Sequence, residues 1–307
     1  MGSIINQLVV FVLGFVPKFI VRRFAGRYIA GDSLSEAVAL VKDLNQRGII
    51  ATLDVLGEGI DDISQGDAAL GDYQQALAAI KEHNLDCNVS LKPTQFGLHL
   101  DEAKAGERIR SIVAQAAEMN NFVRIDMEDA PVTTATIDLY RQLRADYEGH
   151  VGTVVQAYLR RTIDDVQALM ADGPTNLRLC KGIYVEPRDI AYKDFDTVRD
   201  NFIFVLQTAL EGGAYIGIAT HDEWLFFHAD RLIRQMGLKP DQFEFQMLLG
   251  VDEKLQDLII ERGYRLRLYI PYGVEWYAYS MRRLREAPHV AMYIIEGFLR
   301  RLFGAKD

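Results

Sequence analysis

The stretch SLSEAVALVKDLNQRGIIATLDV, residues 33–55, reads as a helix followed by a strand and sets the pattern for most of the chain. Ser33 and Glu36 have the spacing of a capping box, which marks the start of a helix. Gly48 follows the last periodic turn and marks its end. The run 49–55 is apolar and rich in β-branched residues, which is typical of a parallel strand covered on both faces.

Working outward from this stretch, apolar runs of the same kind recur, separated by segments of helical period. The predicted strands are IIATLDV (49–55), CNVSLK (87–92), FVRIDM (122–127), VGTVVQAY (151–158), LRLCKGIY (177–184), YIGIAT (215–220), FEFQML (243–248) and RLRLYIP (265–271). Eight such units in 307 residues predict an α/β fold, a closed (β/α)8 TIM barrel. A doubly wound open sheet is the alternative, but no G-x-G-x-x-G follows the first run and no Walker A sequence occurs.

The domain organisation follows from the absence of a linker or a low-complexity tract. We expect a single barrel domain over 31–307, preceded by a helical segment over 1–30. Within that segment, residues 4–21 are largely apolar and are followed by Arg22 and Arg23. Positive charge after the apolar run is unlike a secretory signal, and polar residues interrupt the run as a membrane span. Helices packed on the domain and a helix lying on a membrane surface both remain open.

Composition excludes some classes of function. The formal net charge of −9 argues against non-specific binding of nucleic acid, which needs a basic surface. The only cysteines, Cys87 and Cys180, lie inside apolar runs and are expected to be reduced thiols. Neither a C-x-x-C pair nor a second histidine at ligand spacing from His221 is present, so we expect no metal site.

The barrel prediction itself locates the site, because active sites of such barrels lie at the carboxyl ends of the strands. Polar side chains gather at those ends, and burying all of them without partners would be costly. Some of them must therefore converge on a polar ligand. The candidates are Asp54, Glu58, Lys92, Asp126, Glu128, Gln156, Tyr158, Lys181, Tyr184, Thr220, His221, Gln246, Tyr269 and Tyr272.

Arginines follow the last predicted strand. Arg282 and Arg283 lie on a predicted helix, and Glu286 is on the same face, where it can orient them. Two guanidinium groups suit a carboxylate ligand, although a solvated basic turn has the same sequence. Lys92 is equally open to interpretation, as a Schiff-base nucleophile, a carboxylate partner or a lysine reaching for water. His221 could bind a metal, transfer a proton or donate to a cofactor.

At the predicted strand ends the chain resembles the proline dehydrogenase family, especially its short monofunctional bacterial members. The resemblance covers about residues 28–290 and is specific because its motifs occur in order at consecutive strand ends. They are LDVLGE (53–58), SLKPTQFGL (90–98), VRIDMED (123–129), TVVQAYLRR (153–161), LRLCKGIYVEP (177–187), ATHD (219–222), FEFQMLLG (243–250) and YIPYGVEWYAYSMRR (269–283).

The resemblance implies a non-covalent FAD over the strand ends. It implies oxidation of L-proline to Δ1-pyrroline-5-carboxylate by hydride transfer to flavin N5, with the electrons passing to a membrane quinone. We also expect a cytoplasmic protein, and the apolar N-terminal run favours peripheral contact with the inner face of the bacterial membrane through residues 1–21. The implied catalytic residues are Lys92, Asp126, Tyr269, Arg282 and Arg283. The implied substrate-binding residues are Lys92, Tyr184, Leu248, Tyr269, Arg282, Arg283 and Glu286.

For the cofactor, the resemblance implies contacts from Asp126, Met127, Gln156, Arg178, Cys180, Lys181, Gly182, Ile183, Tyr184, Thr220 and His221. Gly182 would let the flavin approach the backbone closely because it has no Cβ. Cys180, Ile183 and Pro93 depart from the family pattern, in which valine, alanine and an aliphatic residue are usual. Tyr269 favours proline over hydroxyproline, because the related hydroxyproline enzymes have a small residue there.

Other functions stay open at this point. A Schiff-base lyase or aldolase on the same barrel would use Lys92 or Lys181. A flavin barrel of the methylenetetrahydrofolate reductase type would share the architecture, but it would have no reason to keep Lys92 together with the two arginines. A membrane-surface adaptor would need only the apolar N-terminal stretch.

Overall fold

Parallel strands close into a barrel in this protein. The computed structural model describes residues 22, 26–57, 59–277 and 280–281. Within these residues each strand pairs with the next along the chain, and β8 pairs with β1, so the sheet has no edge. The predicted (β/α)8 barrel is confirmed, and the open sheet is wrong. Residues 1–21, Glu58, Arg282, Arg283 and Glu286 lie outside the described residues.

Each predicted apolar run contains a strand, although several strands are shorter than predicted. The strands are β1 (Ile50–Val55), β2 (Cys87–Leu91), β3 (Val123–Ile125), β4 (Val151–Gln156), β5 (Asn176–Cys180), β6 (Tyr215–Ala219), β7 (Phe243–Leu248) and β8 (Leu266–Tyr272). The largest difference is in β5, which was expected to continue to residue 184. Gly182, with φ of +104°, turns the chain away from the ladder soon after Cys180. Residues 181–184 therefore belong to a loop.

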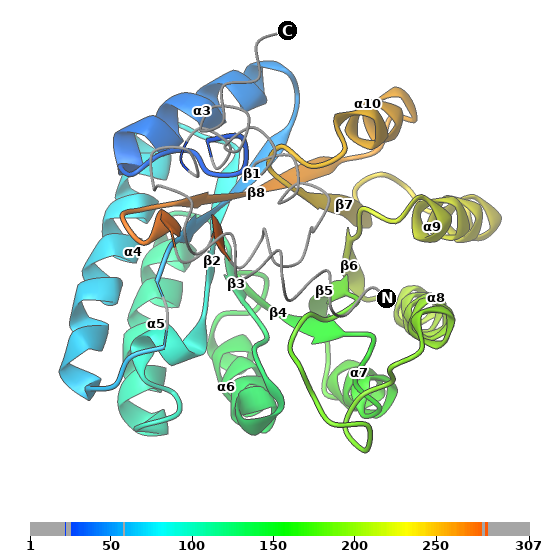
Figure 1. The fold of residues 1–307 in the computed structure, drawn as a ribbon, viewed down its shortest axis with the longest axis horizontal. Coiled ribbons are helices and arrows are strands. Elements are labelled where there is room, and N and C mark those ends of the chain that lie inside the picture. Colours follow the sequence, from blue (N-terminus) through cyan, green and yellow to red (C-terminus); the bar gives the residue numbers. More distant parts are fainter. Residues whose placement is uncertain (1–21, 23–25, 58, 278–279, 282–307) are drawn as a thin grey trace, which may run out of the picture.

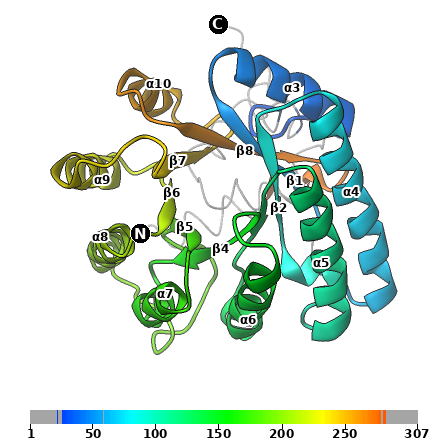
Figure 2. The same ribbon diagram turned by 180° about the vertical axis from the view of Figure 1, so that it is seen from behind.

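Helices surround the strands as an outer ring, seen from one side in Figure 1 and from the other in Figure 2. They are α3 (Leu34–Gln46), α4 (Gly66–Glu82), α5 (Glu102–Glu118), α6 (Ala130–Asp146), α7 (Thr162–Ala171), α8 (Phe195–Glu211), α9 (Glu223–Met236) and α10 (Glu253–Glu261), with short 3-10 turns η1 (Ile63–Gln65) and η2 (Pro93–Phe96). The capping box predicted from Ser33 and Glu36 is present at α3. Among the described residues, none of these helices has the length and apolarity to cross a membrane.

Apolar strand residues pack against the helices and form the main core, which includes Leu53, Val89 and Phe245. Alternate positions fill the barrel interior with polar groups instead. Arg267 donates from Nε to Glu244 Oε1 at 2.7 Å and from Nη1 to Asn88 Oδ1 at 2.8 Å. These bonds join β8 to β7 and to β2. They also give the buried charges of Arg267 and Glu244 hydrogen-bonding partners.

Candidate functional site

Lys92 lies directly after β2 and is held by a buried carboxylate. Its Nζ is 2.7 Å from Oδ1 of Asp54 on β1, whose side chain is only 1% exposed. It also lies 3.4 Å from the hydroxyl of Tyr269 on β8. Pro93 restricts the preceding residue to extended conformations, and Lys92 has φ of −101° and ψ of 122°. The proline therefore helps to aim the lysine across the mouth of the barrel.

Asp126, just after β3, joins this group to the far side of the barrel. Its Oδ2 accepts a hydrogen bond from the Tyr269 hydroxyl at 2.9 Å. Its Oδ1 accepts from Ser90 Oγ and from Arg178 Nη1, both at 2.6 Å. Side chains from five strand ends thus form one connected network, which we call the mouth network: Asp54, Ser90, Lys92, Asp126, Arg178 and Tyr269.

The charges in the mouth network are set by burial and by each other. Burial alone would lower the pKa of Lys92, but the negative charges of Asp54 and Asp126 outweigh it and raise that pKa. Burial would raise the pKa of Asp126, but Arg178 and Lys92 lower it below its usual value. Burial, together with the charges of both carboxylates, raises the pKa of Tyr269 well above its usual value. At neutral pH Lys92 is therefore an ammonium, Asp126 a carboxylate and Tyr269 a neutral phenol.

Arg178 is buried in the barrel, with its side chain only 9% exposed. Its Nε donates to Gln246 Oε1 at 2.5 Å and its Nη2 to Ser90 Oγ at 3.2 Å, in addition to its bond with Asp126. The guanidinium also lies 5.2 Å from the ring centroid of Tyr269. Every nitrogen of Arg178 thus donates to the protein, and the side chain supports the residues above it.

The ends of β4, β6 and β7 carry the other half of the site. Gln156 is buried and donates from Nε2 to the Glu128 carbonyl at 2.9 Å. His221 Nε2 accepts from the backbone N–H of Leu248 at 2.9 Å, which brings these two predicted residues together. Because that nitrogen accepts, a proton on the neutral ring must be on Nδ1. The Thr220 hydroxyl accepts from the backbone N–H of Asp222 at 3.0 Å.

In the loop after β5, Gly182 is required for a different reason from the close approach of the flavin that was expected. A Cβ at Gly182 would lie 2.1 Å from a ring carbon of Tyr158, and φ is positive there. A neighbouring side chain of the protein itself thus requires the glycine. Burial raises the pKa of the nearby Cys180 thiol to about 11, so it stays protonated at neutral pH. Ile183 is 48% exposed, whereas Met127 is buried in the core.

The mouth offers the groups that a flavin dinucleotide needs. Its donors on the β4–β6 side are an amide, a hydroxyl and the ammonium of Lys181, which suit carbonyl and phosphate oxygens. In the part of the chain that the structure describes, no three histidine, cysteine, aspartate or glutamate side chains gather as metal ligands. The amide, hydroxyl and ammonium donors on the β4–β6 side fit the carbonyl and phosphate oxygens of the FAD that the resemblance implies.

Comparison with known proteins identifies the family. The sequence profile of the family described as proline dehydrogenase matches residues 37–292. The chain belongs to the proline dehydrogenase family. Proline dehydrogenase 1 of Bacillus subtilis is 37% identical over 94% of this chain and 94% of its own length. The proline dehydrogenase of Deinococcus radiodurans is 36% identical over 90% of each chain.

A solved structure shares the fold of this proline dehydrogenase family member. It is proline utilization A (PutA) from Bdellovibrio bacteriovorus inactivated by N-propargylglycine, with a TM-score of 0.79 and 24% identity. The match covers 85% of this chain and 32% of that chain, so the chain spans about a third of that protein. At this identity the likeness shows the barrel alone.

Some members of the mouth network had no role assigned from the proline dehydrogenase motifs. The sequence marks Asp54 only as a strand-end polar residue, and Ser90 only as the first residue of the motif 90–98. A signal was present, because both are polar residues at alternate positions of otherwise apolar strands, where an unpartnered polar group is costly. Their partners, however, lie on strands distant in sequence.

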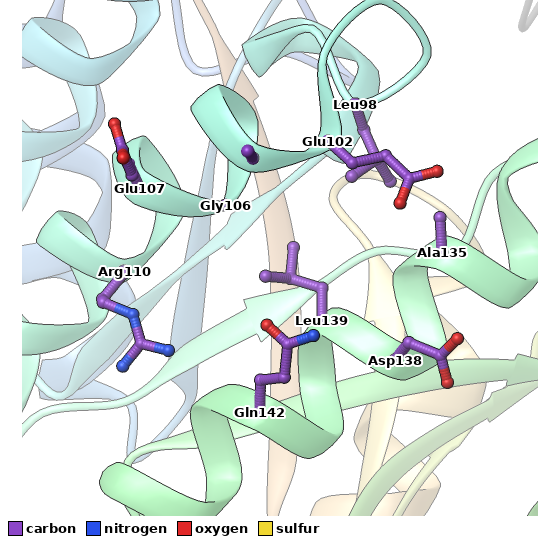
Figure 3. A pocket seen from close by; sticks show the side chains of 10 residues that line it. Leu98, Glu102, Gly106, Glu107, Arg110, Ala135, Asp138, Leu139 and Gln142 are labelled. Atoms are coloured by element: carbon purple, nitrogen blue, oxygen red, sulfur yellow. The ribbon is translucent and has the colours of Figure 1, made fainter.

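A hollow on the outer face is separate from this site. It lies between α5 and α6, with a volume of about 240 Å³. Figure 3 shows Gly106 and Arg110 on one side and Asp138, Leu139 and Gln142 on the other. Both sides are outer helices of the barrel, so the hollow lies away from the strand ends that carry the proline dehydrogenase motifs.

Proposed function

We propose that this protein oxidises L-proline to Δ1-pyrroline-5-carboxylate, with FAD bound at the strand ends and a membrane quinone as the final electron acceptor. The observation that carries the proposal is the mouth network, in which Lys92 is charged and aimed by Asp54 and Tyr269. It occurs in a chain whose relatives are named proline dehydrogenases. Membership of that family also supports an oxidoreductase activity.

Lys92 would bind the carboxylate of proline. Its ammonium is charged at neutral pH and 16% exposed, so it can donate to an anion that enters the mouth. Arg282 and Arg283, oriented by Glu286, would complete the clamp. Tyr184, Leu248 and Tyr269 would pack around the pyrrolidine ring, and Asp126 would hold Tyr269 and Arg178 in place.

FAD would be held by residues at the ends of β3 to β6. Gln156, Lys181, Thr220 and His221 would supply polar contacts, and Asp126, Met127, Arg178, Cys180, Gly182, Ile183 and Tyr184 would shape the surface around them. When bound, the flavin would supply the redox chemistry by accepting a hydride from proline C5 at N5. The cations of the clamp would favour the neutral amine of proline by like-charge repulsion, and a neutral amine is the form that can become an imine.

A Schiff-base enzyme is less consistent with the same contacts. A lysine nucleophile must be neutral to attack a carbonyl carbon. The pKa of Lys92 is raised by Asp54 and Asp126. Lys181 is ion-paired with Asp222. Lys92 is therefore held in the charged form, and Lys181 is already engaged by a carboxylate partner.

The electron acceptor and the location form the last part of the proposal. Quinones are confined to the membrane, so an enzyme that reduces one must reach its surface. The apolar stretch 4–21 supports such contact, with the protein peripheral on the inner face of the cytoplasmic membrane.

The visible spectrum of the purified protein tests the proposed reaction. We expect a flavin absorption that L-proline bleaches in the absence of oxygen, and that D-proline or trans-4-hydroxy-L-proline at the same concentration leaves unchanged. A flavin that L-proline does not bleach would refute the substrate. A colourless protein that FAD does not reconstitute would refute the cofactor. It would make a Schiff-base enzyme the preferred hypothesis.

A further inference from the structure

Beyond the mouth network, an ion-pair cluster at the ends of β5 and β6 joins Lys181, a proposed FAD contact, to two residues that the proposed function does not use. Lys181 Nζ, just after β5, contacts Oδ2 of Asp222, just after β6. Arg199, in the second turn of α8, donates from Nε to Asp222 Oδ2 at 2.8 Å and from Nη2 to Oδ1 at 2.7 Å. We call Lys181, Arg199 and Asp222 the Asp222 cluster.

Asp222 is the rigid centre of the cluster. It is the N-cap of α9, where its Oδ1 accepts from the Trp224 backbone N–H at 3.1 Å. Its side chain is 8% exposed. Burial would raise the pKa of Asp222, but the hydrogen bonds from Arg199 and Lys181 lower it to about 2. The carboxylate is therefore charged and fixed by four polar contacts from three segments.

The cations of the cluster, in contrast, remain accessible. The side chains of Lys181 and Arg199 are 28% and 24% exposed. Both also lie over the ring of Phe195, at 4.4 Å and 4.3 Å from its centroid. Two cations share the single buried carboxylate. Asp196 is 3.7 Å from Arg199 but 81% exposed, so water screens its charge. The cluster thus presents an excess of positive charge.

We propose that Asp222 is a positioning residue that holds Lys181, through this cluster, ready for the diphosphate of FAD. The inference rests on the proposed function, because FAD is the anionic ligand expected at these strand ends. A lysine on a flexible four-carbon stem loses rotamer freedom when it binds an anion. The ion pair with Asp222 restricts the ammonium before the ligand arrives, which lowers the entropic cost of binding.

The test is the affinity of the full-length apoprotein for FAD, measured by the change in flavin fluorescence. We expect Asp222→Asn to raise the Kd for FAD at least about tenfold. Asparagine caps helices as well as aspartate does, so α9 keeps its N-cap. The sign is informative. Removing a negative charge would by itself tighten the binding of an anion, so weaker binding points to lost positioning.

Asp230→Asn is the matched control, because Asp230 is a buried carboxylate on the same helix. It is paired with Arg234, Arg262 and Tyr264 rather than with residues of the mouth. We expect Asp230→Asn to lower the melting temperature but to leave the Kd for FAD unchanged. A loss of FAD affinity equal to that of Asp222→Asn would show a general effect of destabilisation and would overturn the proposal.

A double-mutant cycle with Lys181→Met then tests whether Asp222 acts through Lys181. In the Lys181→Met background, Asp222→Asn should change the Kd by less than about twofold. A full effect there, or unchanged or tighter binding in the single variant, would overturn the positioning role. Should Asp222→Asn not fold, Asp222→Ser removes the same carboxylate, keeps a side chain that caps helices and has the same expected direction. A wild-type protein that does not bind FAD would refute the proposed function itself.

Discussion

Lys92 shows how the environment of one residue selects among several chemistries. In the sequence it could be a nucleophile, a carboxylate partner or a surface lysine. In the structure its ammonium contacts Asp54, and the charges of Asp54 and Asp126 raise its pKa. Because this arrangement keeps the lysine charged, it favours binding of an anion over formation of a Schiff base.

We predict two separable effects of Lys92→Met. The kcat/KM for L-proline should fall by about 10- to 100-fold, because a hydrogen bond to a charged group contributes about 1.5–3 kcal/mol. The protein should also lose stability at neutral pH, because Asp54 stays buried without its cation. Burial raises the pKa of Asp54, and losing Lys92 would raise it further, so urea unfolding should show a smaller loss at acidic pH, where Asp54 takes up a proton. Lys92→Met combined with Asp54→Asn should recover stability but not activity, and recovered activity would contradict the role given to Lys92.

The low pKa of Asp222 makes a prediction about acid stability. Its pKa is lowered from an ordinary 3.8 to about 2 in the folded protein. A lowered pKa contributes stability above the unfolded-state value, and this contribution is lost as the pH falls through the folded value. The difference in unfolding free energy between wild type and Asp222→Asn should therefore be largest near neutral pH and shrink between about pH 4 and pH 2. A difference that stays constant over this range in urea unfolding would be incompatible with a charged Asp222 in the cluster.

At the scale of elements, β6 has a glycine where side chains of the two neighbouring strands contact each other. A Cβ at Gly217 would lie 2.4 Å from Gln246 Nε2 on β7. Gln246 in turn accepts the Nε hydrogen bond of Arg178 on β5. The small residue in the middle strand thus leaves room for a contact between the strands on either side of it.

Gly217→Ala should therefore destabilise the protein by about 1–3 kcal/mol, the usual cost of overpacking a core. Gly71→Ala is the matched control, because Gly71 lies within α4 with nothing within 4 Å of an added Cβ. That variant should gain about 1 kcal/mol, the difference in helix propensity between glycine and alanine. Urea unfolding of both variants measures whether each change lowers or raises the free energy of unfolding. A Gly217→Ala protein as stable as wild type would show that the barrel interior is not tightly packed at this strand.

At the scale of the whole molecule, local charge opposes net charge. The chain carries a formal charge of −9, yet the strand ends carry Lys92, Arg178, Lys181 and the nearby Arg199. The overall sign therefore argues against nucleic acid but does not argue against an anionic ligand. The division into a segment over 1–30 and a domain over 31–307 remains a prediction, as does membrane contact through residues 1–21.

Deleting residues 1–21 tests the membrane contact. We expect the truncated protein to lose its binding to vesicles of bacterial lipid, because an apolar helix face is the proposed anchor. It should keep the L-proline-dependent bleaching of its flavin, since the strand ends are unchanged. Cosedimentation of full-length and truncated protein with the same vesicles measures the difference. Equal binding by the two proteins would place the membrane contact elsewhere, and loss of bleaching would show that the segment belongs to the domain.

Local patterns in the sequence predicted the strands, the capping box of α3 and the closed barrel, because apolar periodicity and cap residues act over a few neighbouring positions. The resemblance supplied most residues of the candidate site. The partners of those residues needed the tertiary structure. Lys92 meets Asp54 across 38 positions, and Arg178 meets Ser90 across 88. Only closure of the barrel brings such residues together, so charge states, the requirement for Gly182 and the Asp222 cluster depend on contacts that no local pattern contains.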